Sequence, residues 1–224
     1  MTEEEMRQAL VDGCHQAHRL GLNGGTAGNF SIRTENAMLI TPTGFPYSDM
    51  RPDMMVACDF DGNHQGPWLP SSEWQMHAEI YRAFPAARAV VHAHPDHCVA
   101  LSCLRQSLPP FHYMVASFGG DDVPCSRYER FGGPALALAA VDALAGRNAC
   151  LLANHGMICF AGTIEKAVSN AAKLEMLARQ YLLARSAGQP VLLNGEEMAQ
   201  VRDRYTTYGQ QPLKSHSPDS ARDS

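Results

Sequence analysis

The central segment of the chain reads Ser71-Ser-Glu-Trp-Gln-Met-His-Ala-Glu-Ile-Tyr-Arg-Ala-Phe-Pro-Ala-Ala-Arg-Ala-Val-Val-His-Ala-His-Pro-Asp-His97. Its serines, its helical spacing of apolar residues and its proline predict a capped helix, a turn and then a buried strand. The strand ends with His92 and His94, and side chains two residues apart on a strand point to the same face. We therefore expect both imidazoles to face a single point.

A third histidine, His155, lies in an Asn-His-Gly sequence after the apolar run 149–153. Three convergent histidines near the carboxylate of Glu73 are the ligand types of a zinc site. Two structural histidines hydrogen-bonded at a sheet edge are the alternative interpretation of His-x-His, and a histidine before glycine can simply occupy a turn. The other histidines, His77 among them, have no ligand spacing, and we interpret them as structural.

Composition excludes several classes of protein. The chain has 224 residues, of which 45% are hydrophobic and 18% charged, as expected for a globular domain with a full core. A net charge of -5 argues against nucleic acid or a membrane surface as the main partner. No apolar run approaches the ~18 residues that span a bilayer. The seven cysteines form no Cys-x-x-Cys pair, and the acidic N-terminus lacks the basic start of a signal peptide, so we expect reduced thiols in the cytoplasm.

The pattern of apolar residues, caps and turns predicts a single α/β domain over residues 1–212, with a polar tail over 213–224 that we expect to be disordered. The predicted helices span 2–20, 73–84 (with Glu73 in the first turn), 95–104, 134–146, 163–187 and 196–205. The predicted strands span 29–33, 37–41, 55–59, 90–94, 111–116, 123–125, 149–153 and 157–160. Few helices and strands alternate strictly, so we predict a central, mostly antiparallel sheet flanked by helices.

Three turns offer hydrogen-bond donors of the kind that bind phosphate. They are Gly24-Gly-Thr-Ala-Gly-Asn29, Thr41-Pro-Thr-Gly44 and the helix cap Ser71-Ser72. Backbone amides and hydroxyls at such turns suit an anion, and the absence of lysine excludes the nucleotide P-loop. Each turn alone has a simpler explanation, because glycines serve turn geometry and serines cap helices. Together with one metal they favour a small phosphate monoester as substrate.

Six motifs, taken in order and at their spacing, resemble the class II aldolase/adducin family over about residues 5–210. They are Gly21-Leu-Asn-Gly-Gly-Thr-Ala-Gly-Asn-Phe-Ser, Leu39-Ile-Thr-Pro-Thr-Gly, Pro70-Ser-Ser-Glu-Trp, Val90-Val-His-Ala-His, His112-Tyr-Met and Asn154-His-Gly-Met. The resemblance implies one Zn²⁺, or another divalent metal, in each subunit of a homotetramer whose sites lie between subunits. Its implied metal ligands are His92, His94, His155 and Glu73.

The resemblance also implies roles for other side chains. Glu73 is implied as an exchangeable ligand and acid/base, and Tyr113 of a neighbouring subunit as the group that serves the aldehyde end. Implied phosphate contacts are Thr26, Asn29, Thr43, Gly44, Ser71 and Ser72. Phe131 and Tyr208 are implied to line the aldehyde side, although Tyr208 fits a packing aromatic equally well.

The implied reaction is the reversible cleavage of a ketose 1-phosphate, such as L-fuculose 1-phosphate, to dihydroxyacetone phosphate and a small aldehyde. We expect a dry pocket and loss of the metal to raise the pKa of Glu73 for proton transfer. The alternatives are 5-deoxyribulose or 5-methylthioribulose 1-phosphate as substrate, a sugar-phosphate 4-epimerase, and a non-catalytic adducin-like interaction domain. Epimerases of the family usually carry aspartate where Glu73 stands, and interaction domains lose the histidines.

Overall fold

The computed structural model describes residues 1–208, in which six strands form one sheet of order β3-β2-β1-β4-β6-β5. Every neighbouring pair of strands in this sheet is antiparallel, as predicted. The strands are β1 (Asn29–Arg33), β2 (Ala37–Ile40), β3 (Val56–Asp59), β4 (Ala89–Ala93), β5 (Ala149–Leu152) and β6 (Gly156–Ala161). The end of the predicted domain (209–212) and the predicted tail (213–224) lie outside the described residues.

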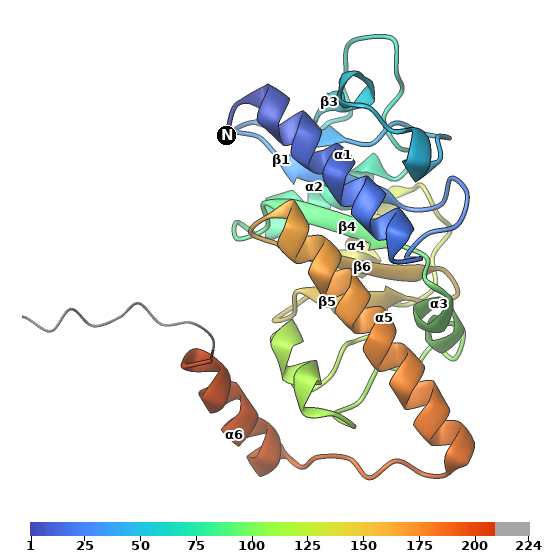
Figure 1. Cartoon of the computed structure of the whole chain (residues 1–224), viewed down its shortest axis with the longest axis vertical. Helices are drawn as coiled ribbons and strands as arrows, with labels where there is room; N and C mark the ends of the chain where they lie inside the picture. The colour runs from blue at the N-terminus through green and yellow to red at the C-terminus, as the bar shows by residue number, and fades with distance from the viewer. Residues whose placement is uncertain (209–224) are drawn as a thin grey trace, which may run out of the picture.

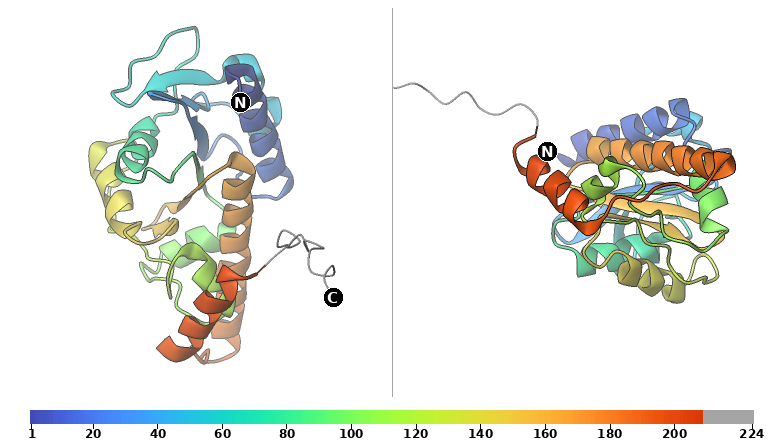
Figure 2. Two further views of the ribbon diagram at one scale, coloured as in Figure 1. Left: turned by 90° about the vertical axis from the view of Figure 1, so that its left-hand side faces the viewer. Right: turned by 90° about the horizontal axis from the view of Figure 1, so that it is seen from below.

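Helices cover both faces of this sheet. They are α1 (Glu3–Arg19), α2 (Trp74–Ala83), α3 (Asp96–Ser102), α4 (Pro134–Ala143), α5 (Ile164–Ala187) and α6 (Gly195–Thr206). Figure 1 shows α1 and α5 crossing one face, and the view from below in Figure 2 shows α2 and α4 on the other. The α/β prediction is therefore confirmed, with the sheet as the middle of three layers. None of these helices in the described range is long and apolar enough to cross a membrane.

Two apolar clusters, one on each face, hold the layers together. β4 lies in the middle of the sheet and is buried along its whole length, which explains why all its residues except His92 are apolar. Val91 belongs to the cluster beneath α1 and α5, whereas Val90 belongs to the cluster beneath α2 and α4. Because alternate residues face opposite sides, His92 turns toward α2, on the same side as Val90.

The predicted strands over 111–116 and 123–125 are wrong. Tyr113–Phe118 forms a short 3-10 helix, η3, whose first turn is capped by a hydrogen bond from Met114 N to His112 Nδ1. Val123 and Cys125 form only isolated bridges, with Leu108 and Leu151. The apolar residues that suggested strands are buried instead by packing a helical turn against the core, a tertiary effect that overrides local β propensity.

Candidate metal centre

Glu73 directly precedes α2, and this position places its carboxylate next to His92 of the central strand β4. It is the N-cap residue, not a member of the first helical turn as expected, and its side chain makes no capping bond. The backbone N–H of Glu73 donates to Ser71 Oγ at 3.3 Å, so the serine side chain takes over part of the capping. The carboxylate is thereby free to point into the protein, where the residue is only 7% exposed.

His92 lies within β4, and His94 follows directly after the strand ends. Their rings converge as predicted, with the two Nε2 atoms 2.8 Å apart. The Nδ1–H group of His92 donates to the carbonyl of Met157 on the neighbouring strand at 2.8 Å. This bond fixes the tautomer that leaves the Nε2 lone pair of His92 free to bind a metal.

His155 sits at the tip of the hairpin between β5 and β6, in a three-residue loop closed by the Leu152 and Gly156 pair. Asn154 adopts the left-handed conformation (φ 53°) that such a loop needs. A Cβ on Gly156 would lie 2.6 Å from the carbonyl oxygen of Ala93 and 2.9 Å from the His94 ring. Glycine is therefore required where the hairpin presses His155 against the other two histidines.

The four predicted ligands form one cluster. Each of Glu73, His92, His94 and His155 offers one ligand atom, and these atoms all lie within 4.8 Å of one another. The centroids of the three imidazole rings are 4.7 to 4.8 Å apart, so no histidine stands outside the group. Glu73 Oε2 is 3.1 Å from His92 Nε2, and Glu73 Oε1 is 3.5 Å from His155 Nε2.

Burial sets the charge of the cluster. It lowers the pKa of His94 to about 3 and that of His155 to about 4, with the neighbouring His92 adding to both effects. Both rings are neutral at pH 7, which is the form that binds metal. Burial also raises the pKa of Glu73, as expected, but His92, His155 and Asn29 outweigh it and hold that pKa well below its usual value. The carboxylate is thus ionised before any ligand arrives, and the expected raised pKa is not found in this state.

The chemistry of these groups fits a divalent metal. Glu73 Oε1 is buried and has no hydrogen-bond donor within residues 1–208. The Nε2 atoms of His92 and His94 are also only 2.8 Å apart, and His92 Nδ1 is already occupied by the Met157 carbonyl, so both Nε2 atoms face the same point. Leaving a buried carboxylate oxygen unpaired is costly, and a cation among these atoms would remove the cost. The donor set of three nitrogens and one carboxylate suits zinc.

A cavity of about 360 Å³ opens beside the cluster, a size suited to a small ligand. It gathers residues from all three predicted phosphate turns together with the metal cluster. Its lining includes Thr26, Asn29, Thr43, Gly44, Ser71, Ser72, Glu73, His94, Phe131 and His155. No lysine or arginine lines it within the described part of the chain, so an anion there would depend on hydroxyl and amide donors and on the N-terminus of α2.

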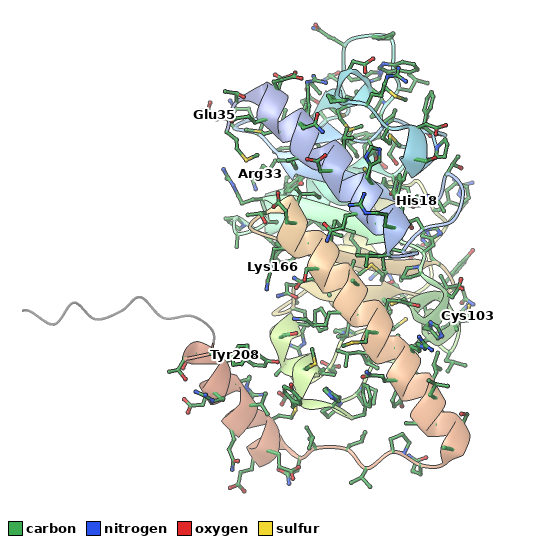
Figure 3. All side chains as sticks on the ribbon, viewed as in Figure 1. His18, Arg33, Glu35, Cys103, Lys166 and Tyr208 are labelled. Atoms are coloured by element: carbon green, nitrogen blue, oxygen red, sulfur yellow. The ribbon has the colours of Figure 1, made fainter. Side chains whose placement is uncertain are left out.

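Tyr113 and Tyr208 do not join this cavity. Both line a second pocket between η3 and α6, and both are exposed, at 52% and 71%. Figure 3 shows Tyr208 beside η3, on the opposite side of the molecule from Cys103, which directly follows α3. The pocket lined by the two tyrosines shares no described residue with the cavity beside the metal cluster.

Sequence reasoning missed several residues of the site. Tyr128 and Glu129 line the cavity, and no motif or spacing distinguished them; Asn154 also lines it and stood in a quoted motif, but no role was predicted for it. His77 was interpreted as structural, and its side chain does have two partners, Ser31 and Asn29. The sequence did indicate that His77 lies close to Glu73, because the two residues are four apart and therefore share one side of α2.

An antiparallel sheet between helices, with a three-histidine and glutamate cluster at the end of its central strand β4, defines the class of this protein. The chain belongs to the class II aldolase and adducin N-terminal domain family, whose model matches residues 8–182. It is 43% identical over 210 residues to L-fuculose phosphate aldolase of Escherichia coli K12, covering 93% of this chain and 98% of that protein. It is also 43% identical over 204 residues to the 5-methylthioribulose-1-phosphate/5-deoxyribulose-1-phosphate aldolase of Rhodospirillum rubrum, covering 91% and 92%. A solved structure of L-fuculose 1-phosphate aldolase superposes with a TM-score of 0.87 at 36% identity, over 90% of this chain and 96% of that one.

Proposed function

We propose that this protein is a zinc-dependent aldolase that reversibly cleaves a ketose 1-phosphate to dihydroxyacetone phosphate and a small aldehyde. The observation that carries the proposal is the meeting of Glu73, His92, His94 and His155 beside a cavity lined by three donor-rich turns. Membership of a family whose curated relatives are named as aldolases supports the same reaction. We place the enzyme in the cytoplasm, where its seven free cysteines remain reduced.

The three histidines and Glu73 would hold the metal. A divalent ion at this position supplies a Lewis acid next to the ketone, which stabilises the negative charge that develops when the C3–C4 bond breaks. The histidines are suited to this role because burial keeps His94 and His155 neutral and Met157 orients His92.

The phosphate end is assigned to Thr26, Asn29, Thr43, Gly44, Ser71 and Ser72. The segments that carry them are tied together, since Ser71 N–H donates to the carbonyl of Thr41 and Thr43 N–H donates to that of Leu69. A phosphate held by this rigid frame contributes binding energy from a group that does not react, and that energy orients the reacting carbons.

Glu73 is assigned the proton transfers at the reacting carbon and hydroxyl. One of its oxygens, Oε2, accepts a hydrogen bond from Asn29 at 2.9 Å, while Oε1 has no such partner in the described chain. An ionised carboxylate with one free oxygen at the wall of the cavity is placed to accept a proton from the substrate and to return it.

The aldehyde end requires a second subunit. Tyr113 and Tyr208 line a separate pocket from the metal cluster of their own chain, and Phe131, which does line the cavity, is 68% exposed. We therefore assign Tyr113 to the site of a neighbouring subunit, where its hydroxyl exchanges a proton with the aldehyde oxygen. Exposed aromatic side chains of this kind are typical of surfaces that become interfaces. The assembly that we propose is a homotetramer with the sites between subunits.

We propose L-fuculose 1-phosphate as the substrate, with 5-deoxyribulose 1-phosphate and 5-methylthioribulose 1-phosphate as alternatives. Relatives of both kinds reach 43% identity to this chain, so the identities are equal for the two substrate classes. All three share the phosphate and ketone ends and differ only in the aldehyde that is released.

The test is to incubate the purified, zinc-loaded protein with each ketose 1-phosphate and measure dihydroxyacetone phosphate. We expect the highest kcat/KM with L-fuculose 1-phosphate, and loss of activity after chelation that zinc restores. A higher kcat/KM with another ketose 1-phosphate would identify that ketose as the substrate. Formation of a C4 epimer without dihydroxyacetone phosphate would identify the enzyme as an epimerase. Turnover unaffected by metal removal would overturn the proposal.

A further inference from the structure

Polar side chains alternate between α2 and β1 directly behind Glu73. On α2, Glu73, His77 and Tyr81 are spaced four residues apart, which places them along one side of the helix. On β1, Asn29 and Ser31 are two residues apart and therefore face the same side of the sheet. Four helical residues rise about 6 Å and two strand residues about 6.6 Å, so the two rows stay in step.

These five side chains form one continuous series of hydrogen bonds. Glu73 Oε2 is 2.9 Å from Asn29 Nδ2, and Asn29 Oδ1 is 2.6 Å from His77 Nε2. His77 Nδ1 is then 2.7 Å from Ser31 Oγ, which is in turn 2.7 Å from the hydroxyl of Tyr81. The series thus runs from a proposed metal ligand into the core between α2 and the sheet.

The direction of every bond follows from the first one. The NH₂ group of Asn29 donates to Glu73 Oε2, so the Asn29 carbonyl oxygen faces His77. His77 must therefore donate from Nε2. Burial lowers the pKa of His77 to about 3, so the ring is neutral and its Nδ1 accepts from the Ser31 hydroxyl. Ser31 Oγ then accepts from Tyr81.

The series cannot serve as an exit for protons. Ser31, His77 and Tyr81 are each 0% exposed, and Asn29 is 4% exposed. Tyr81, at the inner end, is covered by the side chain of Arg33, which donates to the Tyr81 carbonyl. A chain of donors that ends in the core can orient groups but gives a proton no destination in the solvent.

We infer that His77 is a positioning residue that, through Asn29, fixes the orientation of the Glu73 carboxylate. The donor at His77 Nε2 prevents the Asn29 amide from turning its oxygen toward Glu73. Oε2 is therefore held by Asn29, and Oε1 stays directed toward the metal position and the cavity. This inference rests on the proposed function, because it assigns to His77 the alignment of the residue that transfers protons.

The matched variants His77→Gln and His77→Asn separate this role from a general loss of buried polar contacts. A glutamine amide can occupy the position of Nε2 and still donate to Asn29, whereas an asparagine amide reaches only the position of Nδ1. We expect H77Q to keep kcat within about threefold of wild type and H77N to lose about tenfold, because only H77N removes the bond to Asn29. KM should change less than kcat in both variants, because Asn29 alone among the residues assigned to the phosphate is hydrogen-bonded to His77 in the described part of the chain.

Two readouts do not depend on turnover. Zinc affinity, measured by competition with a chelator, should fall about tenfold in H77N and little in H77Q, as for other groups that orient a ligand. Neutron diffraction from wild-type crystals should show hydrogen on Nε2 of His77 and the Asn29 NH₂ group facing Glu73. If either His77 variant fails to fold, Ser31→Ala removes the donor to Nδ1 and is tested by the same measurements, with a smaller loss of kcat expected.

Equal kcat values for H77Q and H77N, or wild-type zinc affinity in H77N, would overturn the inference. Hydrogen on His77 Nδ1 instead of Nε2 would overturn it as well. If the wild-type protein cleaves no ketose 1-phosphate, the proposed function fails, but the neutron and zinc measurements still decide the role of His77.

Discussion

The cavity beside the metal cluster and the pocket beside η3 differ in how completely one chain builds them. At the cavity, rigid elements place Glu73, His92 and His155 within a few ångströms, and the proposed phosphate contacts lie beside them. In the second pocket, Tyr113 and Tyr208 face outward between a short 3-10 helix and α6. Under the proposed function, a single chain would build the metal and phosphate ends of the site, whereas a neighbouring subunit would complete the aldehyde end.

Burial expresses the same difference. His92 is 0% exposed and Glu73 7%, whereas Tyr113 and Tyr208 are 52% and 71% exposed. Exposing large aromatic side chains to water is unfavourable, and burying them against a partner subunit lowers the free energy of the assembly. Variants at the cavity should therefore change the reaction within each subunit, and variants at the tyrosines should depend on which subunits are mixed.

The largest effect is expected for Glu73→Gln, which removes the proposed acid/base but keeps the size of the side chain. The three histidines remain, so zinc should stay bound while kcat falls by about a thousandfold, within the range for general acid–base groups. Zinc content by mass spectrometry and kcat for dihydroxyacetone phosphate release test the two halves of this prediction.

Glu79→Gln is the matched control for that change. Glu79 lies on the same helix but forms an ion pair with Arg82 on the outer side of α2. It should leave kcat and zinc content unchanged, since exposed ion pairs contribute little. Wild-type turnover in E73Q would remove Glu73 from the mechanism, and loss of zinc with turnover would show that it acts mainly as a ligand.

The second-largest effect is expected at the aldehyde end of the site, which we assign to a neighbouring subunit. Tyr113→Phe should lower kcat about a hundredfold, because the hydroxyl proposed to exchange a proton with the aldehyde is lost. Purified Y113F and E73Q are then unfolded together, refolded as a mixture and assayed. If Tyr113 serves a neighbouring subunit, about a quarter of the sites in a random one-to-one mixture combine an intact Glu73 with an intact Tyr113.

Activity near a quarter of wild type in the mixture, with little in either variant alone, is the expected result. Y113F and E73Q each refolded alone are the controls for the refolding step. Activity in the mixture no higher than the average of the two variants would place Tyr113 in the site of its own chain, or outside the site altogether.

The sequence predicted the parts of this protein that depend on local periodicity. His92 and His94 were expected to converge because a strand places alternate residues on one face, and the rings do converge. The run 111–116 was predicted as a strand but forms η3, because its apolar residues are buried by tertiary packing that no local pattern reports. The connection of His77 to Glu73 was not predicted for a related reason, since its partners Asn29 and Ser31 are more than forty residues away in the sequence.

The smallest effect is expected at Tyr208, which lines the second pocket beside Tyr113 and packs edge-on against Tyr205. Tyr208→Ala should raise KM for the aldehyde in the synthetic direction by about five- to tenfold, the cost of losing one aromatic contact. KM for dihydroxyacetone phosphate should not change, because the phosphate turns lie in the other cavity. Tyr208→Phe keeps the ring and should behave as wild type. A change in KM for dihydroxyacetone phosphate instead would mean that the C-terminal helix closes over the phosphate end, and the contrast between the two halves of the site would no longer hold.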